Sequence, residues 1–202
     1  MKENIINDAK NFIEALTLMN EGKAFDININ IPVSGGAFYD CLAVNGEICA
    51  AHPSPIFFGG DRLIYPHVTL KMGTVLPDTA EEIFNKLGEI FSSVRALQLR
   101  PLPVILKSPE NKYYFSEIEN GELFSLSAKL DSELNKLMAA TRHPFGADNL
   151  HHITLGYKPS EEIPEASVKG RVRPFVADRA VVSVKGKYGV CIGAVKTFAF
   201  NN

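Results

Sequence analysis

The sequence predicts an α+β fold built from antiparallel sheets, and two observations support this prediction. Segments with the alternating pattern of strands follow one another directly, and only two or three segments with helical periodicity lie between those runs. A length of 202 residues with a hydrophobic fraction of 46% also suffices for a core without disulfides or metal. We therefore expect residues 1–202 to form a single domain.

The first elements follow from periodicity and from turn signals. Apolar residues at helical spacing predict a helix over about 5–19. Strict alternation of apolar and polar residues over 25–31 predicts a half-buried strand, which Pro32 ends. The dipeptide Asn45-Gly46 is typical of a type I′ turn and predicts a β-hairpin over about 38–50.

The rest of the chain is expected to contain two helices among strands. Asp78 is expected to cap a helix that runs to about Ser93, because a side-chain oxygen at that point can accept from the first helical N–H groups. A stripe of leucines predicts another helix over about 121–140. The remaining expected strands cover 64–72, 96–100, 102–107, 112–118, 150–157, 178–187 and 190–199.

Charge and cysteine content exclude several classes of protein. A net charge of -2 gives no basic surface of the kind that binds long nucleic acid. Three cysteines without close Cys-x-x-Cys spacing argue against a zinc ribbon and favour a reducing compartment, so we expect a cytoplasmic protein. No stretch approaches the ~18 apolar residues of a membrane span, and no membrane association is expected.

Two short segments of the chain share one pattern. Residues 67–70 read His-Val-Thr-Leu, and residues 152–155 read His-Ile-Thr-Leu. In a strand, residues i and i+2 share a face with their Cα atoms about 6.6 Å apart. Each His therefore projects with its Thr, while the apolar residues face the core. If the two strands face each other, two imidazoles and two hydroxyls surround one centre.

This set of groups suits phosphodiester chemistry. An imidazole with a pKa near 6.5 can act as acid or base at neutral pH, and cleavage needs one of each. The Thr hydroxyls can donate hydrogen bonds to non-bridging phosphate oxygens and favour the charge that develops in the transition state. The scheme requires neither a metal nor a cofactor, and none is expected.

The paired His-x-Thr motifs, flanked by apolar residues, resemble the signature of the two-histidine phosphoesterase superfamily, and most closely its bacterial 2′-5′ RNA ligase and cyclic phosphodiesterase branch. The resemblance implies a bilobal fold with pseudo-two-fold symmetry. Each lobe would carry an antiparallel sheet with flanking helices and contribute one motif to a cleft between the lobes. The family usually has a helix between its first strand and first motif, so the hairpin expected at 38–50 and the helix expected at 5–19 depart from its pattern.

The resemblance also implies an activity and the residues that perform it. The family opens 2′,3′-cyclic phosphates or acts on 2′-5′ phosphodiester bonds without metal, which makes a nucleotide or a short RNA the expected partner of a monomeric enzyme. His67 and His152 would be the acid/base pair, and Thr69 and Thr154 would hold the phosphate. Which histidine is the base depends on which ribose oxygen leaves, and this stays open.

Other residues have both a functional and a structural interpretation. Lys71 continues the parity of the first motif and is either a phosphate contact or a solvated strand end. Arg142 lies either on the rim of the cleft or at a helix C-terminus, and Tyr113 either stacks on a base or packs within a sheet. His151 and Tyr157 have the inward parity of the second motif and are expected to be structural.

Two other functions fit the same residues. A binding module could hold a phosphorylated nucleotide or RNA end in this pocket without turnover. A hydrolase of a small, non-nucleotide cyclic phosphate would suit the near-neutral charge of the chain.

Overall fold

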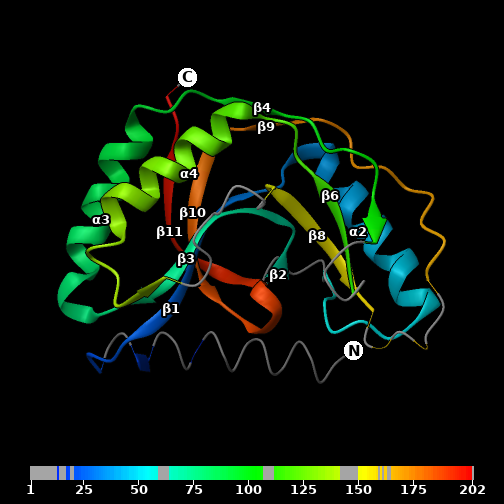
Figure 1. Cartoon of the computed structure of the whole chain (residues 1–202), viewed down its shortest axis with the longest axis horizontal. Coiled ribbons are helices and arrows are strands. Elements are labelled where there is room, and N and C mark those ends of the chain that lie inside the picture. Colours follow the sequence, from blue (N-terminus) through cyan, green and yellow to red (C-terminus); the bar gives the residue numbers. More distant parts are fainter. Residues whose placement is uncertain are drawn as a thin grey trace.

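The computed structural model (Figure 1) describes residues 13, 17–18, 21–58, 64–106, 112–141, 150–158, 160, 162 and 165–201. Its helices are α2 (Gly35–Ala51), α3 (Pro77–Ser92) and α4 (Gly121–Leu134), with a 3₁₀ turn, η1 (Lys187–Gly189). Its strands are β1 (Phe25–Pro32), β2 (Ile64–Tyr65), β3 (His67–Val75), β4 (Leu97–Leu99), β5 (Ile105–Leu106), β6 (Tyr113–Glu117), β7 (Ala140–Thr141), β8 (His152–Tyr157), β9 (Phe175–Ala177), β10 (Arg179–Lys185) and β11 (Cys191–Ala199).

In the described part of the chain, nine strands form one curled antiparallel sheet in the order β2-β11-β10-β1-β3-β8-β6-β5, with β7 beside β3. A second, small sheet pairs β4 with β9. The α+β class with antiparallel sheets is therefore confirmed. The strands that carry the two motifs lie in this one sheet, because Val68 of β3 pairs with Ile153 of β8.

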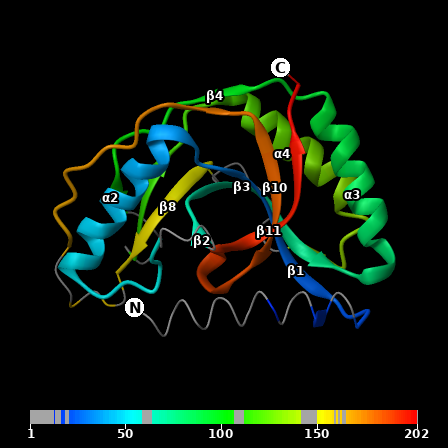
Figure 2. The same cartoon turned by 180° about the vertical axis from the view of Figure 1, so that it is seen from behind.

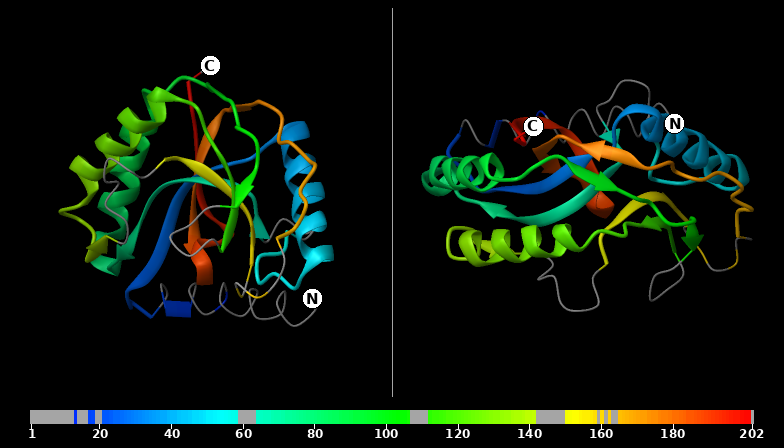
Figure 3. Two further views of the ribbon diagram at one scale, coloured as in Figure 1. Left: turned by 45° about the vertical axis from the view of Figure 1, so that its right-hand side comes forward. Right: turned by 90° about the horizontal axis from the view of Figure 1, so that it is seen from above.

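The helices cover the sheet at two flanks. Helices α3 and α4 lie side by side at one flank (Figure 3), where α4 contacts β3 and α3 contacts β11. Helix α2 lies at the other flank and contacts β8 (Figure 2). None of the helices in the described ranges combines the length and hydrophobicity needed to cross a membrane.

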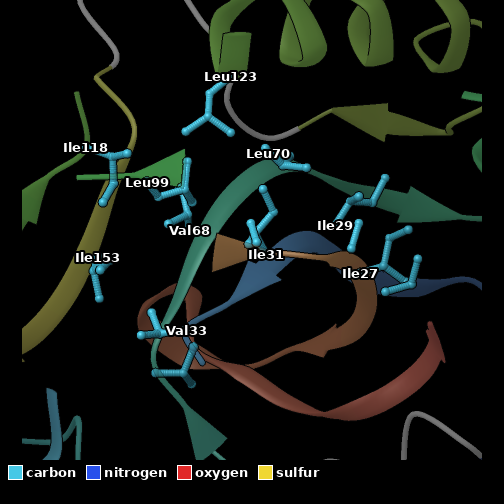
Figure 4. Packing of buried hydrophobic residues seen from close by; sticks show 14 of the residues in the cluster. Ile27, Ile29, Ile31, Val33, Val68, Leu70, Leu99, Ile118, Leu123 and Ile153 are labelled. Atoms are coloured by element: carbon cyan, nitrogen blue, oxygen red, sulfur yellow. The ribbon is translucent and has the colours of Figure 1, made fainter. Parts of the chain in front are cut away.

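The core lies between the helices and the face of the sheet that they cover. Figure 4 shows side chains from β1, β3 and β8 together with Leu123 of α4 in this layer. Fully buried members on the central strands include Ile27, Ile29, Ile31, Val68, Leu70, Ile153 and Leu155. The apolar positions of both His-x-Thr motifs thus anchor their strands in the core, as their parity predicts.

The hairpin expected at 38–50 is wrong, because these residues belong to helix α2. Its buried face includes Ala37, Cys41, Val44 and Ile48, which recur at the spacing of a helix. Asn45 is also buried, and its side chain donates to backbone carbonyls of two other segments instead of forming a turn. The helical period outweighs the turn dipeptide, and a helix does lie between the first strand and the first motif.

Smaller differences concern the ends of the other helices. Helix α3 begins at Pro77 after the N-cap residue Leu76, so Asp78 lies in the first turn and is not the cap. Helix α4 starts after Asn120, whose side chain accepts from two N–H groups of the first turn, and it ends at Leu134, well before residue 140. The helix expected over 5–19 lies largely outside the described residues.

Candidate active site

The two motifs meet on adjacent strands at the centre of the sheet. Val68 pairs with Ile153 in antiparallel register, so His67 lies opposite Thr154 and Thr69 lies opposite His152. Since both central residues are fully buried, the four polar side chains project from the other face of the sheet. In this register the two histidines are diagonal neighbours, with Cα atoms about 7–8 Å apart. The sequence prediction that the motifs surround one centre is consistent with this placement.

A hydrogen bond to the backbone orients each histidine ring. His67 Nδ1 lies 3.0 Å from the Tyr65 carbonyl oxygen, and His152 Nδ1 lies 2.9 Å from the Leu150 carbonyl oxygen. A carbonyl can only accept, so Nδ1 donates and the neutral ring keeps its lone pair on Nε2. Both rings use the carbonyl two residues earlier in the chain, and this common geometry leaves Nε2 as the proton-exchanging atom of each.

The two histidines differ in their surroundings. His152 is exposed and packs against the Phe115 ring, with centroids 5.0 Å apart. His67 is half-buried, with Tyr65 at its edge and ring centroids 6.0 Å apart. Burial lowers the pKa of His67 to about 4, and the nearby His152 also lowers that pKa. The neutral form of His67 is therefore favoured at neutral pH.

Lys71 does not lie on the histidine face, so its expected position is wrong. Between β1 and β3, Thr69 pairs with Asn30 and Lys71 pairs with Ile29, which leaves Leu70 as the extra residue of a β-bulge. The bulge reverses the parity and turns Lys71 toward the helices. There its fully buried Nζ forms an ion pair with Asp131 and a 2.6 Å hydrogen bond to Asn135 of the α4 C-cap.

A matching bulge occurs in the second motif. Tyr114 pairs with Gly156 and Phe115 pairs with Thr154, so Leu155 is the extra residue on β8. After this bulge Gly156 faces Ile48 of α2, and Tyr157 lies beside Tyr113. The bulge at Leu155 therefore turns Tyr157 to the face of Tyr113, and the inward orientation expected for Tyr157 is wrong.

The two tyrosine rings form an aromatic platform next to the site. Their centroids are 5.0 Å apart in an edge-on arrangement, and both rings are half-buried at the margin of the core. The register of β6 places Tyr113 on the same face as Phe115 and Thr154. Tyr113 therefore lies on the β6 side of β8, opposite Tyr157 and beyond Thr154 along the strand. This placement permits either of the interpretations given for Tyr113.

The other predicted residues fall into two groups. His151 is buried and its Nε2 lies 2.7 Å from Ser127 Oγ, which agrees with the structural role expected for it. Burial lowers the pKa of His151 to about 4. Arg142 lies outside the described residues.

Asn28, which no sequence motif singles out, also lies in the site. Its Nδ2 donates to Thr69 Oγ1 over 3.1 Å and lies 3.5 Å from His67 Nε2. The available signal was the polar set of positions in the alternating strand 25–31. That pattern predicts a half-exposed face, but Asn28 and Asn30 are fully buried.

Comparisons with known proteins agree on the fold. No family model and no curated protein sequence matches the chain. Among solved structures, TT0787 of Thermus thermophilus matches with a TM-score of 0.66 at 11% identity, over 87% of this chain and 98% of that one. E. coli LigT in its apo form matches with a TM-score of 0.65 at 13% identity, over 89% of this chain and 99% of LigT.

Two further structures extend the comparison. LigT complexed with 3′-AMP matches with a TM-score of 0.64 at 14% identity, over 89% of this chain and 100% of that one. Kluyveromyces marxianus Usb1 matches with a TM-score of 0.51 at 13% identity, over 88% of this chain and 97% of Usb1. The chain therefore has the fold of LigT, TT0787 and Usb1, which is the fold implied by its resemblance to two-histidine phosphoesterases.

Proposed function

We propose that the chain is a metal-independent phosphodiesterase that acts on 2′,3′-cyclic phosphate or 2′-5′ phosphodiester bonds of nucleotides or short RNA. One observation carries the proposal: two histidines and two threonines project from one face, and each imidazole has its Nε2 set for proton exchange. Proteins of similar structure add support, since LigT was solved with 3′-AMP and with ATP.

The four side chains suffice for opening a cyclic phosphate. One imidazole takes a proton from water as its oxygen forms a bond to phosphorus. The other imidazole gives its proton to the ribose oxygen as the bond between that oxygen and phosphorus breaks. Thr69 and Thr154 lie diagonally across the same site and can donate to the non-bridging oxygens. Protons and bonds balance with groups of this chain, so we expect turnover in EDTA.

The substrate's base is expected beyond Thr154, on the side of the site toward β6. Tyr113 and Tyr157 offer an aromatic surface there, and stacking on such rings contributes about 1–3 kcal/mol per base. Lys71 cannot reach a phosphate from its buried ion pair. Arg142 stays a candidate for a contact at the rim, and a monomeric, cytoplasmic enzyme stays our prediction.

A panel of substrates tests this proposal. Wild type, His67→Ala and His152→Ala are assayed in EDTA with 2′,3′-cyclic nucleotides, cyclic-phosphate oligoribonucleotides, 2′-5′-linked dinucleotides and a small non-nucleotide cyclic phosphate. We expect wild type to turn over at least one nucleotide, and each substitution to reduce its kcat by about 10²–10⁴-fold, as loss of a general acid or base does.

His52→Gln is the matched control for this panel. His52 is buried against Tyr114, which lies on the opposite face of β6 from Phe115, so folded protein with this change should keep its activity. Nucleotide binding without turnover would overturn the proposal in favour of a binding module. Turnover of only the small cyclic phosphate would refute the nucleotide specificity.

A further inference from the structure

The amide of Asn28 lies between three acceptors of the site. Its Nδ2 is 3.1 Å from Thr69 Oγ1, 3.3 Å from the Gly189 carbonyl oxygen and 3.5 Å from His67 Nε2. Asn28 is fully buried on β1, and Gly189 belongs to the 3₁₀ turn between β10 and β11. Two separate segments, β3 and the 3₁₀ turn, therefore hold this one amide beside the first motif.

The Gly189 carbonyl fixes which end of the amide faces the site. A carbonyl oxygen can only accept, so the group that faces it must be the NH₂ group. The same NH₂ group then faces His67 Nε2, which carries the lone pair in the neutral ring. The Gly189 carbonyl also lies beside His67, where it could accept from a protonated Nε2 and so raises the pKa of His67, although burial lowers that pKa more. Because Asn28 donates to this same carbonyl, it competes with a proton on Nε2 and favours the neutral ring. The contact with His67 is the longest of the three, so the lone pair stays available to a substrate.

The same amide directs the hydroxyl of Thr69. Because Thr69 Oγ1 accepts from Asn28, its own hydrogen is left to donate to another acceptor. A non-bridging phosphate oxygen is such an acceptor. Asn28 thereby favours the states of His67 and Thr69 that general-base catalysis needs.

The second motif has a different neighbour. Glu117 of β6 pairs with His152 across the sheet, and the alternation of β6 places it on the same face as Phe115. Opposite residues in an antiparallel pair have Cβ atoms about 4.5–5.5 Å apart. A carboxylate at that distance favours the protonated imidazole. His152 also interacts electrostatically with His67 and His151.

We propose that Asn28 and Glu117 are positioning residues that divide the two catalytic roles, Asn28 by keeping His67 neutral as the general base and Glu117 by keeping His152 protonated as the general acid. The assignment of roles in turnover rests on the proposed function. The protonation states themselves do not, and they can be measured without any substrate.

Imidazole NMR of the full chain tests the protonation states directly. Signals of the two histidines are assigned with His67→Ala and His152→Ala, and both are followed from pH 4 to 9. We expect His67 to remain the neutral Nδ1–H tautomer down to about pH 5, as its pKa of about 4 implies, and His152 to protonate at higher pH than His67. Protonation of His67 before His152 as the pH falls would overturn the proposal, whether or not the protein is active.

Two isosteric variants test the positioning residues. In Asn28→Asp a carboxylate replaces the donor beside His67, so the pKa of His67 should rise toward or above its ordinary value near 6.5. In Glu117→Gln the pKa of His152 should fall. On a substrate found in the panel, the acidic limb of the pH–rate profile moves up in Asn28→Asp, and the alkaline limb moves down in Glu117→Gln. At a pH on the displaced limb, kcat/KM falls about tenfold for each pH unit of displacement.

Matched controls separate these effects from general damage. Asn30→Asp places a carboxylate on the same face of β1, where the native amide bonds Ser183, and Glu119→Gln removes an exposed carboxylate just beyond β6. Both should move the limbs less than the test variants. If Asn28→Asp fails to fold, the titration of wild type still tests the protonation states of both histidines, and Glu117→Gln still tests the role of Glu117. An unchanged pKa of His152 in folded Glu117→Gln refutes the role of Glu117.

Discussion

Replacement of Gly156 by alanine tests the close packing of β8 on α2 beside the bulge of the second motif. A Cβ at this position would lie 2.8 Å from both Cδ1 and Cγ2 of Ile48 in α2. Contacts this short force side chains or backbone to move, and overpacking of a core costs about 1–3 kcal/mol. We therefore expect Gly156→Ala to lower the free energy of unfolding by that amount in urea denaturation, with an unchanged m-value.

Gly46→Ala provides a matched control with the opposite sign. Gly46 lies on the exposed face of the same helix as Ile48, and a Cβ there would meet no atom within 4 Å. Alanine is a better helix former than glycine by about 0.8–1.0 kcal/mol, so this variant should be more stable than wild type. Equal stability of Gly156→Ala and wild type would refute the close packing of β8 on α2.

A double-mutant cycle attributes the effect to Ile48. Ile48→Ala alone should destabilise the protein by about 2–5 kcal/mol, because it leaves a cavity in the core. It also removes both atoms that the new Cβ would approach. Gly156→Ala should therefore cost less in the Ile48→Ala background, and strict additivity would contradict this explanation.

Three further predictions concern buried polar groups. Lys71→Ala should destabilise the protein by about 3–5 kcal/mol because it leaves Asp131 without its buried partner, and Lys71→Met should cost less in the same denaturation assay. Asn45→Ala should cost at least about 1–3 kcal/mol, since it removes two donors to buried carbonyls, and a loss near zero would argue against that tether. The pKa of about 4 for His67 and His151 lies below the ordinary value near 6.5, so the unfolded chain binds more protons between these values. Stability should be full above about pH 6.5 and decline as the pH falls through about 4, and a pH-independent midpoint would contradict this.

Much of the site could be predicted because the two-residue period of a strand determines which side chains share a face. Alternation alone places His67 with Thr69 and His152 with Thr154, and it places the intervening apolar residues in the core. Alternation no longer predicts the orientation of side chains after Leu70 and Leu155, because a bulge at each of these residues reverses the parity of the strand. After the bulges Lys71 contacts Asp131 of α4 and Gly156 packs on Ile48 of α2, and no local pattern contains these tertiary contacts.

The other differences also arise from tertiary contacts. Asn45-Gly46 has the local preference of a turn, but burial of the α2 face and the bonds of the Asn45 amide hold it in a helix. Asn28 is indistinguishable in the sequence from a solvated strand residue. The turn at Gly189, far along the chain, brings the carbonyl that orients its amide.

The proposed chemistry depends most directly on whether His67 and His152 act as one acid/base pair. We would measure kcat/KM against pH for wild type, His67→Ala, His152→Ala and the double variant, on one cyclic phosphate in EDTA. We expect a bell-shaped wild-type profile, and a double variant hardly slower than the slower single variant, because groups that act as a unit are strongly non-additive. A profile without two limbs, or losses that multiply in the double variant, would contradict this pairing.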